Sequence, residues 1–291
     1  MGNARWIGIF CLGVTVVGWA LNWPAMKVLL REWPPLFSRG AAGLAAALIL
    51  AVVATGRGET LAFPRHALPK LLFASFTNVF AWMGFATVAM KWVSVSEGAL
   101  LVYTMPIWAI LLAWPLLGTR PTMRDVAALL LGLLGVGVLL GGQGLRFSSE
   151  EIFGFALALA SAVSFALGTV LNRSPLPIAP TALVAWQVGI GCLAMVLIGL
   201  PLERPDFAAL SPAGWSVLIY MTLVPMGVCY LTWFESLRHL PASVASMGTL
   251  LVPLIGAISA SLTLGEPLGL REAAAIALTL SGVTLALQKS A

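Results

Sequence analysis

The chain contains one long stretch twice. The first copy reads VSEGALLVYTMPIWAILLAWPLLGTRPTMRDVAALLLGLLGVGVLL at residues 95–140, and a shift of 147 residues (253 − 106) places Pro106 on Pro253. Leucines coincide by chance in so apolar a chain, but prolines, glycines and an arginine followed by an acid do not. The further matches are Ser96 with Ser243, Gly118 with Gly265, Arg124 with Arg271, Asp125 with Glu272, Gly135 with Gly282 and Val136 with Val283. We therefore infer an internal duplication.

Composition places the chain in a membrane. Hydrophobic residues make up 60% of its 291 residues and charged residues only 9%, with a mean hydropathy of +0.98. Because a helix needs about 20 apolar residues to cross the hydrocarbon core, the length allows roughly ten spans with short connections and leaves no room for a soluble domain. We predict an all-α integral membrane protein with ten transmembrane helices, at residues 5–24, 36–54, 68–90, 95–117, 123–141, 151–171, 181–200, 213–236, 241–263 and 270–287.

The two halves are expected to have opposite orientations. Five spans per half is an odd number, so the second half starts on the other face of the membrane, and the duplication is an inverted repeat. We place the first repeat at residues 1–141, a polar linker at 142–150 and the second repeat at 151–291. The distribution of Lys and Arg over the connections favours cytoplasmic N- and C-termini. We interpret the first apolar run as a retained helix rather than a cleaved signal peptide.

A face of small, hydroxyl and aromatic side chains recurs at helical spacing in the first and sixth spans. Lipid gives such residues no reason to recur, whereas close helix packing or a water-filled cavity does. The recurrence favours a cavity, and packing through small residues is the alternative. The face comprises Thr15, Gly18, Trp19 and Asn22 in the first span, and Ser161, Ser164, Phe165 and Gly168 in the sixth.

Prolines lie at matching positions in the middle of the fourth and ninth spans. Pro106 and Pro253 each remove the hydrogen bond to the carbonyl four residues earlier. A freed carbonyl persists in a bilayer only where protein or cavity water satisfies it. The pair indicates the hinges of a rocking-bundle transporter, with a static packing kink as the alternative. Tyr103 and Ser246 on the same spans are candidate substrate contacts.

The third and eighth spans carry polar and aromatic side chains deep in the membrane. Asn78 is the most costly of them, because an amide in hydrocarbon must find a partner. The sequence allows a neighbouring helix and a substrate equally as the hydrogen-bond partner of Asn78. Trp19, Trp82 and Trp233 lie too deep for the interfacial aromatic belt, and Tyr230 is close to Trp233 in the sequence. These rings indicate bulk packing or an aromatic-walled pocket for apolar or aromatic solutes.

Charged side chains inside the spans are few. Arg39, Lys91, Glu97 and Glu235 each fall within a turn or two of a span end, where we expect structural pairing. No buried carboxylate stands out as a proton carrier. A uniporter or a weakly coupled exchanger is therefore as consistent with the sequence as an antiporter.

Signatures of enzymes and of bound cofactors are missing from the sequence. The two histidines lie beside loops and the three cysteines stand singly, so neither a catalytic triad nor a metal site nor a disulfide framework is indicated. The glycines at 132–141 lack the Lys-Ser/Thr of a nucleotide loop, and we interpret Gly137 and Gly141 as a helix-contact pattern. Basic residues are scattered, which argues against nucleic-acid binding. We expect no catalytic residue, no cofactor and no metal.

Several motifs resemble the drug/metabolite transporter superfamily, and within it the ten-helix family made of two EamA domains. They are GWALN at 18–22, SVSEGALLVYTMP at 94–106, LPASVAS at 240–246, LVPLIG at 251–256 and LGEPL at 264–268. The resemblance covers essentially the whole chain. Within the family, the sequence is similar to YddG-type members, which export aromatic and other amino acids. The resemblance implies alternating access around a cavity lined by spans 1, 3, 4, 6, 8 and 9, with spans 5 and 10 outside. The family's Glu-Pro stands only at Glu266 and Pro267, and the first half lacks it.

We therefore predict a transporter of the bacterial cytoplasmic membrane that exports small organic solutes, with amino acids, including aromatic ones, favoured. Its expected partners are the solute and the lipid bilayer, with no nucleic acid, and it is a monomer or a weak homodimer. One alternative is export of lipophilic cations through cation–π contacts, but the sequence shows no buried acid to bind them. The others are export of nucleobases or other metabolites, and a non-transporting scaffold or a channel. The candidate substrate contacts are Trp19, Asn22, Asn78, Trp82, Tyr103, Ser164, Phe165, Tyr230 and Ser246, with Pro106 and Pro253 as hinges.

Overall fold

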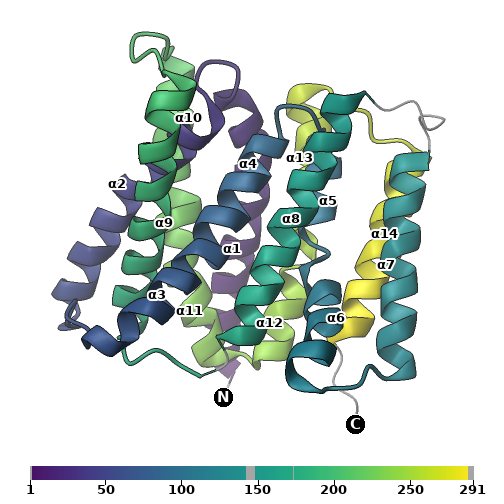
Figure 1. Cartoon of the computed structure of the whole chain (residues 1–291), viewed down its shortest axis with the longest axis horizontal. Helices are drawn as coiled ribbons and strands as arrows, with labels where there is room; N and C mark the ends of the chain where they lie inside the picture. The colour runs from purple at the N-terminus through teal and green to yellow at the C-terminus, as the bar shows by residue number, and fades with distance from the viewer. Residues whose placement is uncertain (1, 142–147, 173, 288–291) are drawn as a thin grey trace.

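Helices form all the regular structure in the part of the chain that the computed structural model describes, residues 2–141, 148–172 and 174–287. Eight helical runs there are long and apolar enough to cross a membrane, and the ninth span holds a shorter apolar helix. With α7 added, every one of the ten predicted spans has a helical counterpart, which confirms the predicted fold class. The continuous spans (Figure 1) are α1 (Gly2–Leu29), α2 (Pro35–Gly56), α7 (Met123–Gly141), α8 (Ser149–Leu171), α9 (Pro180–Glu203) and α14 (Leu270–Leu287).

The third and eighth spans are interrupted at matching places. The third consists of η1 (Arg65–Ala67), α3 (Leu68–Ser75), η2 (Phe76–Gly84) and α4 (Phe85–Ala89). The eighth consists of α10 (Pro212–Leu223), η3 (Val224–Val228) and α11 (Cys229–His239). Both η2 and η3 are π-helical, a geometry that is rare in helices and frequent at functional sites. The two repeats therefore share a departure from α-helical geometry in the middle of the bundle.

The fourth and ninth spans break just before their prolines. A turn at residues 103–104 separates α5 (Val95–Val102) from α6 (Met105–Leu117), and one at 249–250 separates α12 (Ala242–Gly248) from α13 (Leu251–Leu264). Pro106 and Pro253 thus fall in the first turn of a new helix, where a missing N–H costs nothing. The predicted interruptions are confirmed, while the use of these prolines as hinges stays a prediction.

Equivalent helices of the two repeats pack against each other. α2 lies along α9, and α7 lies along α14 (Figure 1). A Cβ built on Gly135 of α7 would meet the Ala275 carbonyl oxygen at 2.9 Å, and one built on Gly282 of α14 would meet the Ala128 carbonyl oxygen at 2.7 Å. Gly135 and Gly282 are repeat equivalents, and so are Ala128 and Ala275. Each helix therefore presents the equivalent glycine to the equivalent backbone carbonyl of its partner helix, as a two-fold interface requires.

The predicted helix contact through Gly137 is wrong. Nothing lies within 4 Å of a Cβ built there, because this side of α7 is exposed. The contact runs instead through Gly135, two residues earlier and on the face that meets α14.

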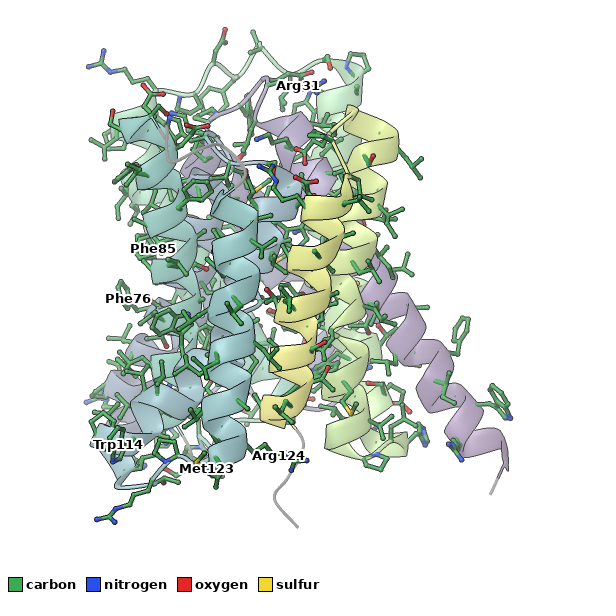
Figure 2. All side chains as sticks on the ribbon, turned by 90° about the vertical axis from the view of Figure 1, so that its right-hand side faces the viewer. Arg31, Phe76, Phe85, Trp114, Met123 and Arg124 are labelled. Carbon is green, nitrogen blue, oxygen red and sulfur yellow. The ribbon has the colours of Figure 1, made fainter. Side chains whose placement is uncertain are left out.

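The bundle has two ends, marked in Figure 2 by Arg31 at one and by Trp114, Met123 and Arg124 at the other. α1 begins and α14 ends at the second of these, which we call the termini end (Figure 1). The end marked by Arg31 in Figure 2 is the far end. Most of the linker predicted at residues 142–150 lies outside the described residues.

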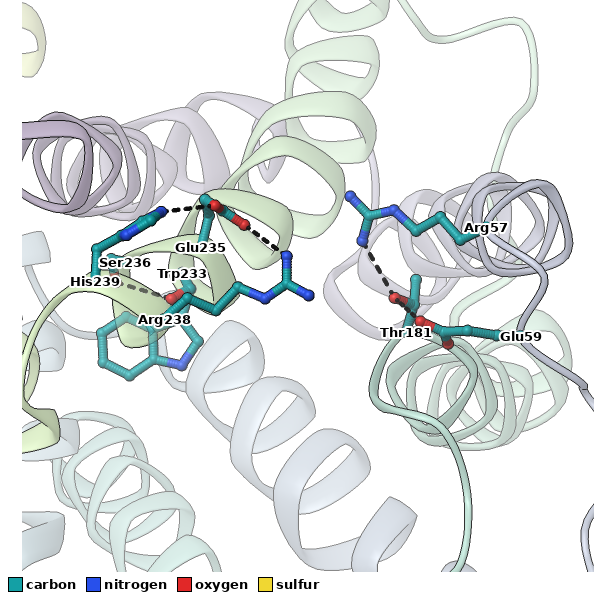
Figure 3. A network of polar contacts seen from close by, with 8 residues as sticks. All are labelled: Arg57, Glu59, Thr181, Trp233, Glu235, Ser236, Arg238 and His239. Carbon is teal, nitrogen blue, oxygen red and sulfur yellow. Dashed lines mark hydrogen bonds and ion pairs between the residues drawn. The ribbon is translucent and has the colours of Figure 1, made fainter. Parts of the chain in front are cut away.

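Glutamates tie α2 and α9 together at both ends. At the far end, Glu203, the last residue of α9, accepts the N–H of Phe37 at 2.8 Å. At the termini end, Glu59 after α2 accepts the N–H of Ala182 at 2.9 Å and the Thr181 hydroxyl at 2.8 Å (Figure 3). A carboxylate at a helix N-terminus satisfies free N–H groups and meets the positive end of the helix dipole. Each of the two helices is thus capped at its N-terminus by a glutamate from the C-terminal end of the other helix or just beyond it.

Candidate functional site

A cavity of about 550 Å³ lies between the two repeats. Spans 1, 3, 4, 6, 8 and 9, which the sequence motifs had indicated, all contribute to its wall. The tenth span, expected to lie outside, also reaches the wall with Ala286 and Leu287 in its last turn. The predicted contacts that line the cavity are Trp19 on α1, Asn78 and Trp82 on η2, Tyr103 in the turn after α5, Phe165 on α8 and Tyr230 on α11.

The cavity extends toward the termini end. Leu287, the last residue of α14, lines it there. Polar contacts close the far end, where Glu266 binds the Val95 N–H at the start of α5. The Lys27 ammonium at the end of α1 also donates to the carbonyl of Met90 at 2.7 Å. Access to the cavity in this conformation is therefore from the termini end.

Aromatic rings make up much of the wall. The Trp19 ring packs against Tyr230 and Trp233, with centroids 5.9 and 5.7 Å away, and the ring centroids of Trp82 and Phe165 are 5.0 Å apart. The indole N–H of Trp19 donates to a backbone carbonyl of η3 at 3.0 Å. That bond fixes the orientation of the ring. The π-helical stretch of the eighth span thus positions one of the deep tryptophans.

Asn78 bonds a neighbouring helix and also lines the cavity, while its contact with a substrate stays a prediction. Its Nδ2 donates to Gln187 Oε1 on α9 at 3.4 Å, and its Oδ1 accepts from the Thr77 hydroxyl at 3.4 Å. Both amides line the cavity. Gln187 was not among the predicted site residues, although an amide in the middle of the apolar α9 was a usable signal.

A smaller recess of about 50 Å³ adjoins the cavity and is lined by Asn22 and Arg39. Trp19, Trp82, Tyr103 and Tyr230 line both spaces, so these rings stand between them. Asn22, predicted to contact the solute in the cavity, faces the recess instead. Its Oδ1 accepts a hydrogen bond from Arg39 Nη1 at 3.3 Å.

Structural pairing was the wrong expectation for Arg39. The residue lies in the second turn of α2 and is only 6% exposed. Among the described residues, no carboxylate comes within ion-pair distance of its guanidinium, and its Nε has no hydrogen-bond partner. The sequence position of Arg39 near a span end does not reveal its burial. The rotation of α2 about its axis decides which side of the helix faces the cavity, and that rotation cannot be read from the sequence.

The other charges near span ends do have partners. Glu235 pairs with Arg238 at 3.2 Å and with His239 at 3.0 Å (Figure 3), which confirms the expectation for this residue. Glu97 forms a capping box with Ser94. Lys91 lies over the ring of its neighbour Trp92, 5.1 Å from the centroid, so its contact is with an aromatic ring rather than an acid.

The remaining candidates fall outside the two spaces. Ser164 is half-buried on α8 and is not among the described residues that line the cavity or the recess. Its neighbour Ser161 donates to the Trp82 carbonyl at 2.7 Å and so joins the sixth span to the third. The side chain of Ser246 lies outside the described residues. Pro106 lines the cavity, whereas Pro253 is buried within α13.

Comparison with known proteins agrees with this architecture. An uncharacterized transporter of Bacillus subtilis (strain 168), YvbV, is 29% identical over 286 residues, which cover 96% of this chain and 91% of that protein. A probable amino-acid metabolite efflux pump of Salmonella typhimurium (strain LT2) is 30% identical over 297 residues, covering 95% and 93%. A solved crystal structure matches with a TM-score of 0.67 over 98% of this chain and 96% of the other, and its 20% identity supports the fold alone.

The sequence model of one family matches each half of the chain. It is described as the EamA-like transporter family, and it covers residues 6–141 and 152–288. The two matches correspond to the two helical repeats that pack through α2 with α9 and α7 with α14. The protein therefore belongs to the EamA-like transporter family, and it is a membrane transporter rather than an enzyme.

Proposed function

We propose that this transporter exports small organic solutes across the bacterial cytoplasmic membrane by alternating access, with amino acids, including aromatic ones, as its favoured substrates. The observation that carries the proposal is the aromatic-walled cavity between the repeats, which reaches the termini end and is closed at the far end. With both termini in the cytoplasm, as proposed from the charge distribution, this conformation faces the cytoplasm. An exporter loads its solute in that state.

The size and chemistry of the cavity support this substrate class. A volume of about 550 Å³ lies within the range of small-molecule sites, which are apolar with a few polar groups that orient the ligand. Trp82 and Phe165 provide stacking surfaces, and the amides of Asn78 and Gln187 provide the polar groups. Relatives named as amino-acid metabolite efflux pumps point in the same direction.

Export of lipophilic cations is disfavoured by Arg39. Its guanidinium lines the recess next to the cavity without a carboxylate partner among the described residues. At an effective dielectric constant of 20, a second positive charge about 8 Å away is repelled by about 2 kcal/mol. Cation–π attraction to the tryptophans, about 0.5–2 kcal/mol, is of the same size and opposite sign. A net preference for cations is therefore not expected.

We further propose which parts of the chain carry transport. Residues 1–141 and 151–291 act as the two repeats, and the breaks before Pro106 and Pro253 allow the fourth and ninth spans to move. A single chain contains the whole cavity, so a monomer suffices for function. The residues proposed to contact the solute are Trp19, Asn78, Trp82, Tyr103, Phe165 and Tyr230, which line the cavity.

The test is uptake of radiolabelled amino acids into proteoliposomes, each with and without an imposed pH gradient. Saturable uptake that exceeds protein-free liposomes, and counterflow driven by unlabelled amino acid, is the expected result for a carrier. A gradient-independent rate identifies a facilitator, and a gradient-dependent rate identifies proton coupling. Absence of amino-acid uptake under both conditions contradicts the substrate assignment, and non-saturable flux without counterflow contradicts the carrier mechanism.

A further inference from the structure

Arg39 carries a charge that the fold does not explain. It is 6% exposed, and its hydrogen bond to the neutral Asn22 amide measures 3.3 Å. Burying a cation is expensive unless an anion and further hydrogen bonds compensate for the lost water.

We propose that Arg39 binds the carboxylate of the transported solute in the recess. The inference rests on the proposed transport function and narrows it to one substrate class, which is organic acids and zwitterions that carry a free carboxylate, amino acids among them. A guanidinium is suited to this task because its planar N–H groups match the two oxygens of a carboxylate.

A carboxylate fits the recess by volume. Each enclosed water molecule needs about 10–15 Å³, so the recess of about 50 Å³ has room for about three to five atoms of that size. A carboxylate has three heavy atoms, whereas an amino acid with a bulky side chain, such as phenylalanine, is too large. The side chain of the solute therefore remains in the larger cavity, beyond the rings of Trp19, Trp82, Tyr103 and Tyr230 that border both spaces.

Two residues that line the recess also carry buried hydrogen-bond donors that lack acceptors. Within the described residues, Arg39 Nε and Trp82 Nε1 are both buried without a hydrogen-bond partner, and both side chains line the recess. The nearby indole of Trp19 differs, because its N–H already donates to the Pro225 carbonyl at 3.0 Å. An ionised carboxylate is an acceptor only, with about four lone-pair sites. Its chemistry complements a space with surplus donors and a positive charge.

Arg39 lies on α2, a helix that side-chain caps join to α9 at both ends. Glu203 and Glu59 tie α2 and α9 together at opposite ends. The fourth span, which breaks before a proline, contributes Val102 and Tyr103 to the wall of the recess. A fixed charge on the α2 and α9 scaffold can hold the carboxylate while the broken spans rearrange around it.

The experiment compares phenyl compounds of similar size that differ in charge. The melting temperature of the purified full-length protein is measured against 3-phenylpropionate, phenylalanine and phenethylamine, for wild type, R39Q and R39K. We expect the two carboxylates to raise the melting temperature of wild type and phenethylamine to leave it unchanged. R39Q should weaken carboxylate binding at least tenfold and R39K by less, because lysine keeps the charge and loses the paired geometry. R57Q is the matched control, since Arg57 is an exposed arginine just after the same helix.

Two results overturn the proposal. One is equal stabilisation of wild type by phenethylamine and 3-phenylpropionate, which needs no variant and so remains decisive if R39Q does not fold. The other is unchanged carboxylate affinity in a folded R39Q. Parallel flux measurements separate the site from the transport function. Carboxylate binding without any flux supports the site and contradicts transport, whereas equal flux of amines and carboxylates supports transport and contradicts the site.

Discussion

The carboxylate of Glu266 caps the N-terminus of α5 by accepting the N–H of Val95, with its two oxygens 3.0 and 2.8 Å from that nitrogen. This bond joins the end of the ninth span to the start of the fourth, the two spans that break before a proline. Thr119 occupies the equivalent position in the first repeat, and α12, which starts at the termini end, has no side-chain cap. Among the described residues, the two interrupted spans therefore share a side-chain cap at the far end and none at the start of α12.

Removing this cap should favour opening of the far end. We expect Glu266→Ala to lower stability by about 1–2 kcal/mol, as loss of a helix cap does. The readout is labelling of Met26→Cys, a buried position beside the recess, by an impermeant thiol reagent added from the far-end side. The native cysteines are buried, so background labelling is low.

Glu150→Ala is the control for this variant, because Glu150 is exposed near the start of α8. Labelling should increase in the Glu266 variant and stay at the wild-type level in the control. Equal labelling of Met26→Cys with and without Glu266 would show that the cap does not bias the conformational equilibrium.

Two glycines on α7 should respond in opposite ways to alanine. Gly135→Ala places a methyl group 2.9 Å from a backbone oxygen of α14, so it should destabilise the protein by about 1–3 kcal/mol. Gly137→Ala points into open space and should stabilise α7 by up to about 1 kcal/mol through helix propensity. Thermal unfolding in one detergent measures both, and a smaller loss at 135 than at 137 would be inconsistent with the α7 and α14 interface.

Truncating Asn78 should lower flux more than it lowers folded yield. The bond from Asn78 to Gln187 is long, at 3.4 Å, so its loss costs little stability, whereas loss of a substrate hydrogen bond worth about 1.4 kcal/mol weakens binding about tenfold. We expect Asn78→Ala to reduce initial uptake by about that factor at low substrate. Ser216→Ala, on the exposed side of α10, is the control. Parallel losses of flux and yield would make Asn78 structural.

Substitutions of Tyr103 test the role of the aromatic wall between the cavity and the recess. It is 8% exposed and lines both spaces, so Tyr103→Ala should enlarge the opening between them and reduce saturable uptake. Tyr103→Phe keeps the ring and should retain more of the uptake. A Phe variant as impaired as the Ala variant would assign the effect to the hydroxyl instead of the ring.

Pro106→Ala and Pro253→Ala should slow turnover more than they weaken binding. Alanine restores an N–H donor near each break and favours a continuous helix. We expect the maximal uptake rate to fall by several-fold for each variant while the half-saturating substrate concentration changes little. Pro212→Ala, in the first turn of α10, is the matched control. Unchanged rates in both variants would mean that the breaks are static.

The half-buried carboxylate of Glu32, at the far end, should make the stability of the protein depend on pH. Ser211 donates its hydroxyl at 2.6 Å and its N–H at 2.9 Å to Glu32, and these bonds lower the pKa of the Glu32 carboxyl. Because the pKa of Glu32 is lower in the folded state, the ionised carboxylate stabilises the fold at pH values above the unfolded-state pKa of about 4.3. This stabilisation is lost as the pH falls through the folded-state pKa. The melting temperature of wild type should therefore fall more steeply below about pH 4.3 than that of Glu32→Gln, and coincident profiles would contradict the assignment.

The ten spans, their duplication and the breaks at both prolines were predictable from the sequence because each depends on local properties. Hydropathy over about 20 residues defines a span, and a proline interrupts the helix that contains it. The deep aromatic residues could be identified for a similar reason, since position within a span sets depth. Six of the predicted contact residues line the cavity, and all of them except Asn78 are aromatic.

Only the tertiary structure decided which polar groups meet. Glu203 with Phe37, Glu59 with Ala182 and Glu266 with Val95 join residues more than 100 positions apart, and no local pattern encodes those distances. The same holds for Arg39, whose sequence position near a span end indicated pairing while the packing of α2 turned it into the recess. Hydropathy determines that a helix crosses the membrane, but the rotation of the helix about its axis follows from contacts with its neighbours. That rotation places an unpaired positive charge beside the cavity.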